Sequence, residues 1–213
     1  MKMRVFLSVI LWAWVLTVGA KNIEPRFDGK KITNDVFWNT AEGMPLYSQG
    51  GGIFRYPDPD TGRLRYYWYG VRYAEAVRYR EDPSVTYPAC TFEAVTCYSS
   101  DDLINWYYEG DVLTREEVDR YGRAGWVGRM GVAYLEAWNQ YVLVVQHDNG
   151  VLFALSHTPN GRFTWHRRIT MEKIIGTPNT GDQTVFVDED TRKPYLIYSY
   201  GRGRNRIYVS EIG

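Results

Sequence analysis

The sequence lacks an excess of charge of either sign. Among 213 residues, Lys+Arg number 25 and Asp+Glu number 25, so the formal net charge is +0. A balanced chain creates no long-range field that would attract nucleic acid or anionic lipid. Nucleic-acid-binding domains normally carry a basic patch or stripe, and the sequence contains none. We therefore expect no nucleic-acid partner.

Cysteine is scarce, since Cys90 and Cys97 are the two in the chain. Zinc sites need Cys and His at short, regular spacings, and no such cluster occurs. An exported protein can form a disulfide, but two cysteines are bridged only when their Cβ atoms face each other. The sequence leaves two alternatives open, a small disulfide-closed loop or a pair of free thiols.

A long apolar run occurs at the N-terminus alone, over residues 5–18, after Lys2 and Arg4. A transmembrane helix needs about 20 apolar residues, so this run is too short. A short basic start, an apolar stretch and small residues at its end are typical of a secretory signal peptide. We predict that residues 1–20 are the signal peptide and that residues 21–213 are exported, either to the periplasm or into the medium, with no membrane span left after cleavage.

Helical periodicity is missing as well, because no long stretch places apolar residues at i, i+3, i+4 and i+7. Short runs rich in aromatic and β-branched residues alternate instead with turn residues, which predicts an all-β protein. The expected strands include residues 65–69, 91–98, 132–135, 141–146, 151–156, 184–188, 195–200 and 206–211.

These strands recur in units, each with a turn containing Asp, Gly or Asn and a strand that ends in Ser. Such repetition is typical of a β-propeller, whose blades are four-stranded antiparallel sheets. About three blades fit into the chain, whereas propellers have about 4–8. We therefore expect an incomplete propeller with an unpaired edge. Residues 72–88 are expected to form an insertion, and the charged residues 115–125 a short helix or loop at the rim.

Three segments together resemble glycoside hydrolase family 43, in particular its galactan- and arabinogalactan-active branch. The glycine-rich residues 49–54, with the Tyr-Tyr-Trp-Tyr-Gly of residues 66–70 as the partner strand, resemble the first-blade hairpin of that family. Residues 97–106 resemble the segment that closes a blade in that family, and residues 181–190 resemble its third-blade segment. The resemblance implies a five-bladed propeller, complete only with blades that this chain does not contain, and an inverting hydrolase of galactosyl or arabinosyl linkages in plant polysaccharides.

Inverting hydrolysis uses one carboxylic acid to protonate the leaving oxygen and one base to activate water. The resemblance places Asp182 at the third carboxylate, which tunes the pKa of the acid and holds its orientation. It places Gln49 where the wider family has the base, and an amide is not an effective proton acceptor. No segment after Asp182 matches the family's sequence motif that contains the general acid. We therefore expect the general acid beyond Gly213 and little or no activity from this chain alone.

Gln49 is predicted to contact substrate, and so are four further residues: Trp126, Arg129, Gln146 and His147. The expected ligand is an oligo- or polysaccharide, because Trp and Tyr rings, of which the chain has 8 and 18, match the C–H faces of a sugar. No cofactor is expected. Part of the family carries a metal ion on the propeller axis, but no oxygen-ligand loop in this sequence supports one. Two alternatives are a non-catalytic carbohydrate-binding propeller fragment and a half-propeller that needs a partner chain to close it.

Overall fold

The computed structural model describes residues 31–122, 125–148, 150–199 and 205–213. The predicted signal peptide lies outside these residues. Within them, no helix has the length and apolar character needed to cross a membrane.

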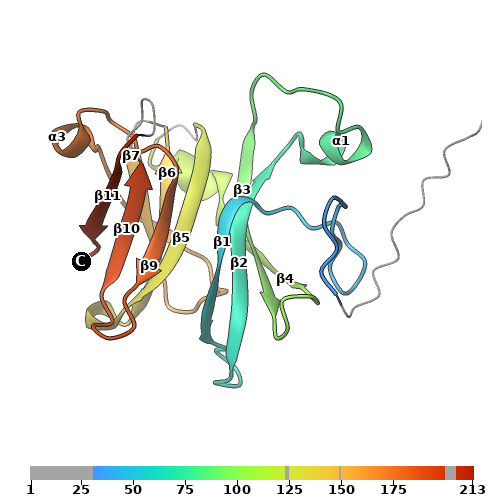
Figure 1. Cartoon of the computed structure of the whole chain (residues 1–213), viewed down its shortest axis with the longest axis horizontal. Coiled ribbons are helices and arrows are strands. Elements are labelled where there is room, and N and C mark those ends of the chain that lie inside the picture. The colour runs from blue at the N-terminus through green and yellow to red at the C-terminus, as the bar shows by residue number, and fades with distance from the viewer. Residues whose placement is uncertain (1–30, 123–124, 149, 200–204) are drawn as a thin grey trace, which may run out of the picture.

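The described chain folds into three antiparallel sheets that follow one another in chain order (Figure 1). The first sheet contains β1 (Gln49–Pro57), β2 (Leu64–Tyr73), β3 (Phe92–Ser100) and β4 (Tyr107–Thr114). The second contains β5 (Val127–Leu135), β6 (Gln140–His147), β7 (Gly150–Ser156) and β8 (Thr164–Ile169), and the third contains β9 (Gln183–Val187), β10 (Pro194–Ser199) and β11 (Ile207–Glu211). The short helices are α1 (Ala76–Glu81), α2 (Arg115–Arg120), the 3-10 turn η1 (Glu136–Trp138) and α3 (Glu172–Ile175).

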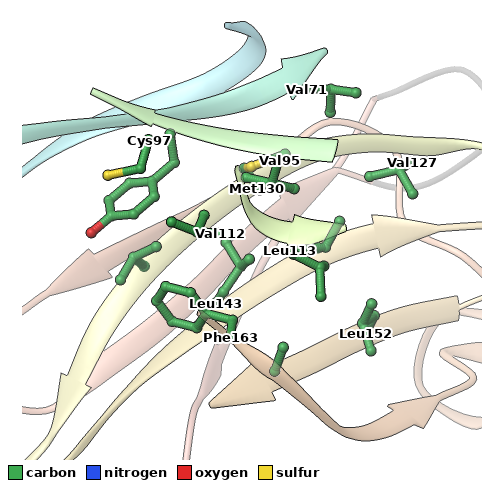
Figure 2. Packing of buried hydrophobic residues seen from close by; sticks show 14 of the residues in the cluster. Val71, Val95, Cys97, Val112, Leu113, Val127, Met130, Leu143, Leu152 and Phe163 are labelled. Atoms are coloured by element: carbon green, nitrogen blue, oxygen red, sulfur yellow. The ribbon is translucent and has the colours of Figure 1, made fainter. Parts of the chain in front are cut away.

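Strands β5, β6 and β7 of the second sheet are buried on both faces, and this explains the unbroken apolar run of β6. Tyr141, Leu143 and Val145 pack toward the first sheet, in the cluster drawn in Figure 2. Val142 and Val144 belong to a second cluster, shared with the third sheet. Successive side chains of a strand point to opposite faces, so a strand between two covered faces must be apolar at every position.

The third sheet is buried on one face and open on the other. Val185, Leu196 and Tyr198 pack into the cluster shared with the second sheet. On the opposite face, Phe186, Ile207 and Val209 are 50%, 77% and 62% exposed. An exposed apolar sheet face of this kind normally marks a surface on which another element packs.

Strands β1, β5 and β9 lie side by side, each as the first strand of its sheet (Figure 1). Gly131 of β5 faces Val185 of β9 so closely that a Cβ at residue 131 would lie 2.6 Å from the backbone nitrogen of Val185. Only glycine permits this approach of two strands. The arrangement of successive antiparallel sheets around adjoining first strands is that of part of a β-propeller.

Tyrosine hydroxyl groups of the first sheet connect it to the second. Tyr56 donates to the carbonyl of Val132 (2.6 Å), and Tyr69 donates to the carbonyl of Pro159 (2.6 Å). Tyr73 donates to the carbonyl of Val127 (2.5 Å). Since these side chains also contribute large apolar surfaces to the core, part of the abundance of Tyr is structural.

The predicted all-β class is confirmed, and the predicted strands of the second and third sheets are present. A short helix, α2, lies within residues 115–125, as one of the two alternatives predicted. The insertion 72–88 contains α1, and β4 and β8 were not among the predicted strands. Both cysteines are free, Cys90 at the surface and Cys97 in the core, so the disulfide alternative is not the one found.

Candidate functional site

A cavity of about 970 Å³ lies at the end of the sheets where β1, β5 and β9 begin. Five residues predicted to form the site line it: Gln49, Trp126, Arg129, Gln146 and Asp182. They are spread over residues 49–182 of the sequence and come together only in the folded chain.

Gln49 is the first residue of β1, and it is exposed to the cavity. The strand bulges directly after it, between Gln49 and Gly52. At Gly51 the backbone passes so close to β2 that a Cβ would lie 1.5 Å from the carbonyl oxygen of Tyr69. The run of glycines is therefore required by this close approach, and the bulge re-aims the start of the strand into the cavity.

Arg129 of β5 and Asp182, the residue directly before β9, form an ion pair, with Arg129 Nε 3.2 Å from Asp182 Oδ1. Both side chains are 46% exposed. An exposed pair of this kind contributes about 0–1 kcal/mol, so a ligand hydroxyl group can compete for the guanidinium of Arg129 at little cost.

Gln146 is buried and holds the segment in front of Asp182. Its Nε2 donates to the carbonyls of Thr180 and Gly181, each at 2.8 Å. Its Oε1 accepts from the backbone N–H of Arg129 (3.3 Å). Gln146 therefore positions both members of the ion pair.

The backbone of Asp182 is also anchored to β10. Its carbonyl accepts from the N–H of Ser199 (2.9 Å), and the N–H of Gly181 donates to the carbonyl of Ser199 (2.9 Å). The carboxylate is thus presented from a fixed backbone, as a group that positions a reactant must be.

Trp126, directly before β5, presents a half-exposed ring to the cavity. Two hydrogen bonds to Asp148 fix its backbone: its N–H donates to Asp148 Oδ1 (2.7 Å), and its carbonyl accepts from the N–H of Asp148 (2.9 Å). A flat ring held in this way offers a stacking surface to a sugar ring.

His147 does not line the cavity. It is fully buried, and its ring lies edge-on to Trp165 at a centroid distance of 6.0 Å. Gln146 and His147 are consecutive residues of one strand, so their side chains point to opposite faces. Burial lowers the pKa of His147, an effect that Asp148 opposes and Arg168 reinforces.

Several cavity residues were not predicted from the sequence. Trp68 and Tyr73 come from β2, and the segments 36–39 and 74–91 supply Phe37, Trp38, Glu75, Tyr79, Arg80, Val85, Tyr87 and Cys90. The density of aromatic residues in these segments was the signal that could have identified them.

Among the described residues, two carboxylates line the cavity, Glu75 and Asp182. Partial burial disfavours the ionised form of Glu75, but hydrogen bonds from Thr91 outweigh it and lower the pKa of Glu75 below its ordinary value. The backbone N–H of Thr91 donates to Glu75 Oε2 at 2.8 Å. A general acid at neutral pH needs a raised pKa, so Glu75 is unsuited to that role.

No protein-family model and no curated protein sequence matches the chain. Solved structures do match it. An exo-beta-1,3-galactanase from Clostridium thermocellum, 1,3Gal43A, is 27% identical with a TM-score of 0.65, over 85% of this chain and 38% of that one. A GH43 beta-1,3-galactosidase, BT3683, solved with galactodeoxynojirimycin, is 21% identical with a TM-score of 0.65, over 85% of this chain and 62% of that one.

An exo-beta-1,3-galactanase from Phanerochaete chrysosporium, solved with beta-1,3-galactotriose, is 22% identical with a TM-score of 0.64, over 83% of this chain and 38% of that one. The chain therefore spans between 38% and 62% of the length of these three structures. The resemblance predicted from residues 49–54, 97–106 and 181–190 is confirmed by these matches.

Proposed function

We propose that this chain, which resembles the galactan-active branch of glycoside hydrolase family 43, binds galactosyl saccharides in the cavity of Arg129 and Asp182 as part of a glycosidase. The observation that carries the proposal is the convergence of Gln49, Arg129 and Asp182, from the starts of three adjoining first strands, in one cavity.

The chemistry of the polar residues suits a sugar. The guanidinium of Arg129 can donate several hydrogen bonds, and Asp182 is an acceptor, so together they match the paired donor and acceptor character of neighbouring hydroxyl groups. Gln49 adds an amide that can donate and accept. The ring of Trp126 supplies the apolar face against which a pyranose stacks.

In the proposed reaction, Asp182 orients a general acid and raises its pKa by like-charge repulsion. The acid and the base of an inverting hydrolase lie about 6.5–9.5 Å apart, with room for water between them. Neither role suits Glu75, whose pKa is lowered, or Gln49, which is an amide. We propose an enzyme built on a five-bladed propeller, in which other residues supply the acid and the base. We propose that it is exported and acts on galactosyl linkages of plant polysaccharides, including those of arabinogalactan.

A second candidate is a carbohydrate-binding propeller without catalysis. The amide at Gln49 and the low pKa of Glu75 favour it, because both leave the cavity suited to hydrogen bonding rather than to proton transfer. Both candidates require the same binding site, so binding is tested first and hydrolysis second.

Titration calorimetry of the full chain with galactose and β-1,3-galactobiose tests the site. We expect Arg129→Ala to weaken binding about 10- to 100-fold, because a hydrogen bond from a charged group contributes about 1.5–3 kcal/mol. Arg55→Ala is the matched control, since Arg55 lies on β1 over the ring of Tyr66 and away from the cavity. Equal affinity of the two variants would refute the proposed site.

Hydrolysis is then measured as the release of galactose from β-1,3-galactan. Release that Asp182→Asn abolishes would support a glycosidase, whereas binding without release would support the second candidate. Release that Asp182→Asn leaves unchanged would contradict the role proposed for this carboxylate.

A further inference from the structure

The cavity has a second region, built by two segments that the polar site does not use. Residues 36–39 precede β1, and residues 74–91 connect β2 to β3 and contain α1. In the register of β1 with β2, Gln49 pairs with Val71, so the 74–91 segment emerges at the end of the sheet where Gln49 enters the cavity. Figure 1 shows α1 beyond this end of β2 and β3.

The surface of this region is mostly apolar. Phe37, Tyr79 and Val85 line the cavity while remaining 43%, 46% and 43% exposed, and Tyr87 lines it as well. We call these four residues the apolar lobe. Phe37 and Tyr79 are in edge-on contact, with ring centroids 6.0 Å apart, so the two segments meet at this surface.

The charged side chains beside the apolar lobe are bonded to the protein. Arg80 donates to the carbonyl of Trp38 (2.9 Å) and to the side chain of Asn39, and its guanidinium lies 5.2 Å from the ring centre of Phe37. Glu75 accepts from the N–H of Thr91. Arg80 therefore links residues 37–39 to α1, and the surface of the lobe that remains open to a ligand is mostly apolar.

The size of the cavity also favours a ligand larger than one sugar. Sites for drug-sized ligands measure about 300–1,000 Å³, and the cavity, at about 970 Å³, lies at the upper end of that range. The polar residues Arg129, Asp182 and Gln49 occupy the part formed by the first strands. The apolar lobe remains for a different part of the same ligand.

We propose that the apolar lobe binds a planar apolar group, such as a phenolic aglycone, that is attached to the galactosyl unit held by Arg129 and Asp182. This inference rests on the proposed function for the place of the sugar. A second sugar could stack on these rings as on Trp126, but it fits the lobe less well, because each of its hydroxyl groups loses hydrogen bonds to water that must be replaced on binding. An aromatic ring loses none, and it gains about 25 cal/mol for each Å² of apolar surface that is buried.

Calorimetry with four probes tests the inference on the full chain: methyl β-galactoside, 2-naphthyl β-galactoside, β-1,3-galactobiose and 2-naphthol. We expect the naphthyl glycoside to bind at least tenfold more tightly than the methyl glycoside. We expect Tyr79→Ala to remove most of that difference while leaving the affinity for methyl β-galactoside unchanged. Val77→Ala is the matched control, because Val77 is an exposed residue of the same helix that does not line the cavity.

Equal affinity for the methyl and naphthyl glycosides would overturn the inference. So would a preference for galactobiose over the naphthyl glycoside that Tyr79→Ala removes, because the lobe would then hold a sugar. Failure of the proposed function looks different, since neither methyl β-galactoside nor galactobiose would bind. In that case, binding of 2-naphthol that depends on Tyr79 would still support the lobe, and its absence would overturn it.

Discussion

Replacement of Tyr69 by Phe tests how strongly the first and second sheets are joined. Tyr69 is fully buried, and its hydroxyl donates to the carbonyl of Pro159, which is also buried, at 2.6 Å. Burial raises the pKa of Tyr69 well above its ordinary value, so the hydroxyl stays protonated and a donor at neutral pH. The variant keeps the ring and loses only this donor.

The expected cost follows from the group left behind. A buried carbonyl without a donor is destabilising by about 1–3 kcal/mol. For a domain of about 150–250 residues, each kcal/mol lowers the Tm by about 2–4 °C, so the Tm should fall by about 2–12 °C. Urea unfolding followed by Trp fluorescence measures the change in the free energy of unfolding.

Tyr107→Phe provides the control for Tyr69→Phe, because Tyr107 is exposed on β4 of the same sheet. Its free energy of unfolding should change by less than about 0.5 kcal/mol. If Tyr69→Phe and Tyr107→Phe unfold at the same urea concentration, the hydrogen bond to Pro159 does not stabilise the junction between the sheets, and the reasoning fails.

Three further predictions concern other parts of the chain. Burial lowers the pKa of His147, so below pH about 6.5 the unfolded chain binds more protons than the folded one, and the free energy of unfolding decreases as the pH is lowered. In urea titrations from pH 7 to 5, this decrease should be smaller for His147→Leu. Desolvation raises the pKa of the Cys90 thiol, so its alkylation rate, measured by mass spectrometry, should still rise with pH above about 8.5, where the rate of an ordinary thiol levels off. The rate should fall when a galactoside fills the cavity, and a rate that the ligand leaves unchanged would contradict binding there. Replacing both Phe186 and Val209 by Ser should lower the fluorescence of a bound apolar dye, with stability retained within about 0.5 kcal/mol, if the open face of the third sheet is what the dye binds.

The sequence predicts the fold best where strands are buried. The apolar runs 132–135, 141–146 and 151–156 lie within β5, β6 and β7, because these three strands are covered on both faces. It predicts less where strands face water. β8, with the sequence Thr-Trp-His-Arg-Arg-Ile, is mostly exposed and has no apolar pattern, and β4 is interrupted by irregularities in its pairing with β3.

The candidate site could be predicted in part, because residues at the starts of the first strands of neighbouring sheets must converge. Gln49, Arg129 and Asp182 satisfy this rule and line one cavity. The rule of alternation also separates Gln146 from His147, which cannot both face the ligand. The apolar lobe could not be predicted, since residues 36–39 and 74–91 follow no repeat and their meeting depends on the hydrogen bonds of Arg80.

The covered second sheet gives the two sides of the cavity different mechanical properties. Arg129 and Gln146 belong to strands of the most buried sheet, whose backbone amides should exchange with solvent last. Helix α1 has no buried residue, and its first residues lack a side-chain cap, so its amides should exchange early. Recognition of the sugar should therefore be rigid and selective, while the opposite wall can adapt to aglycones of different shape, so related ligands should differ mainly in how long they stay bound.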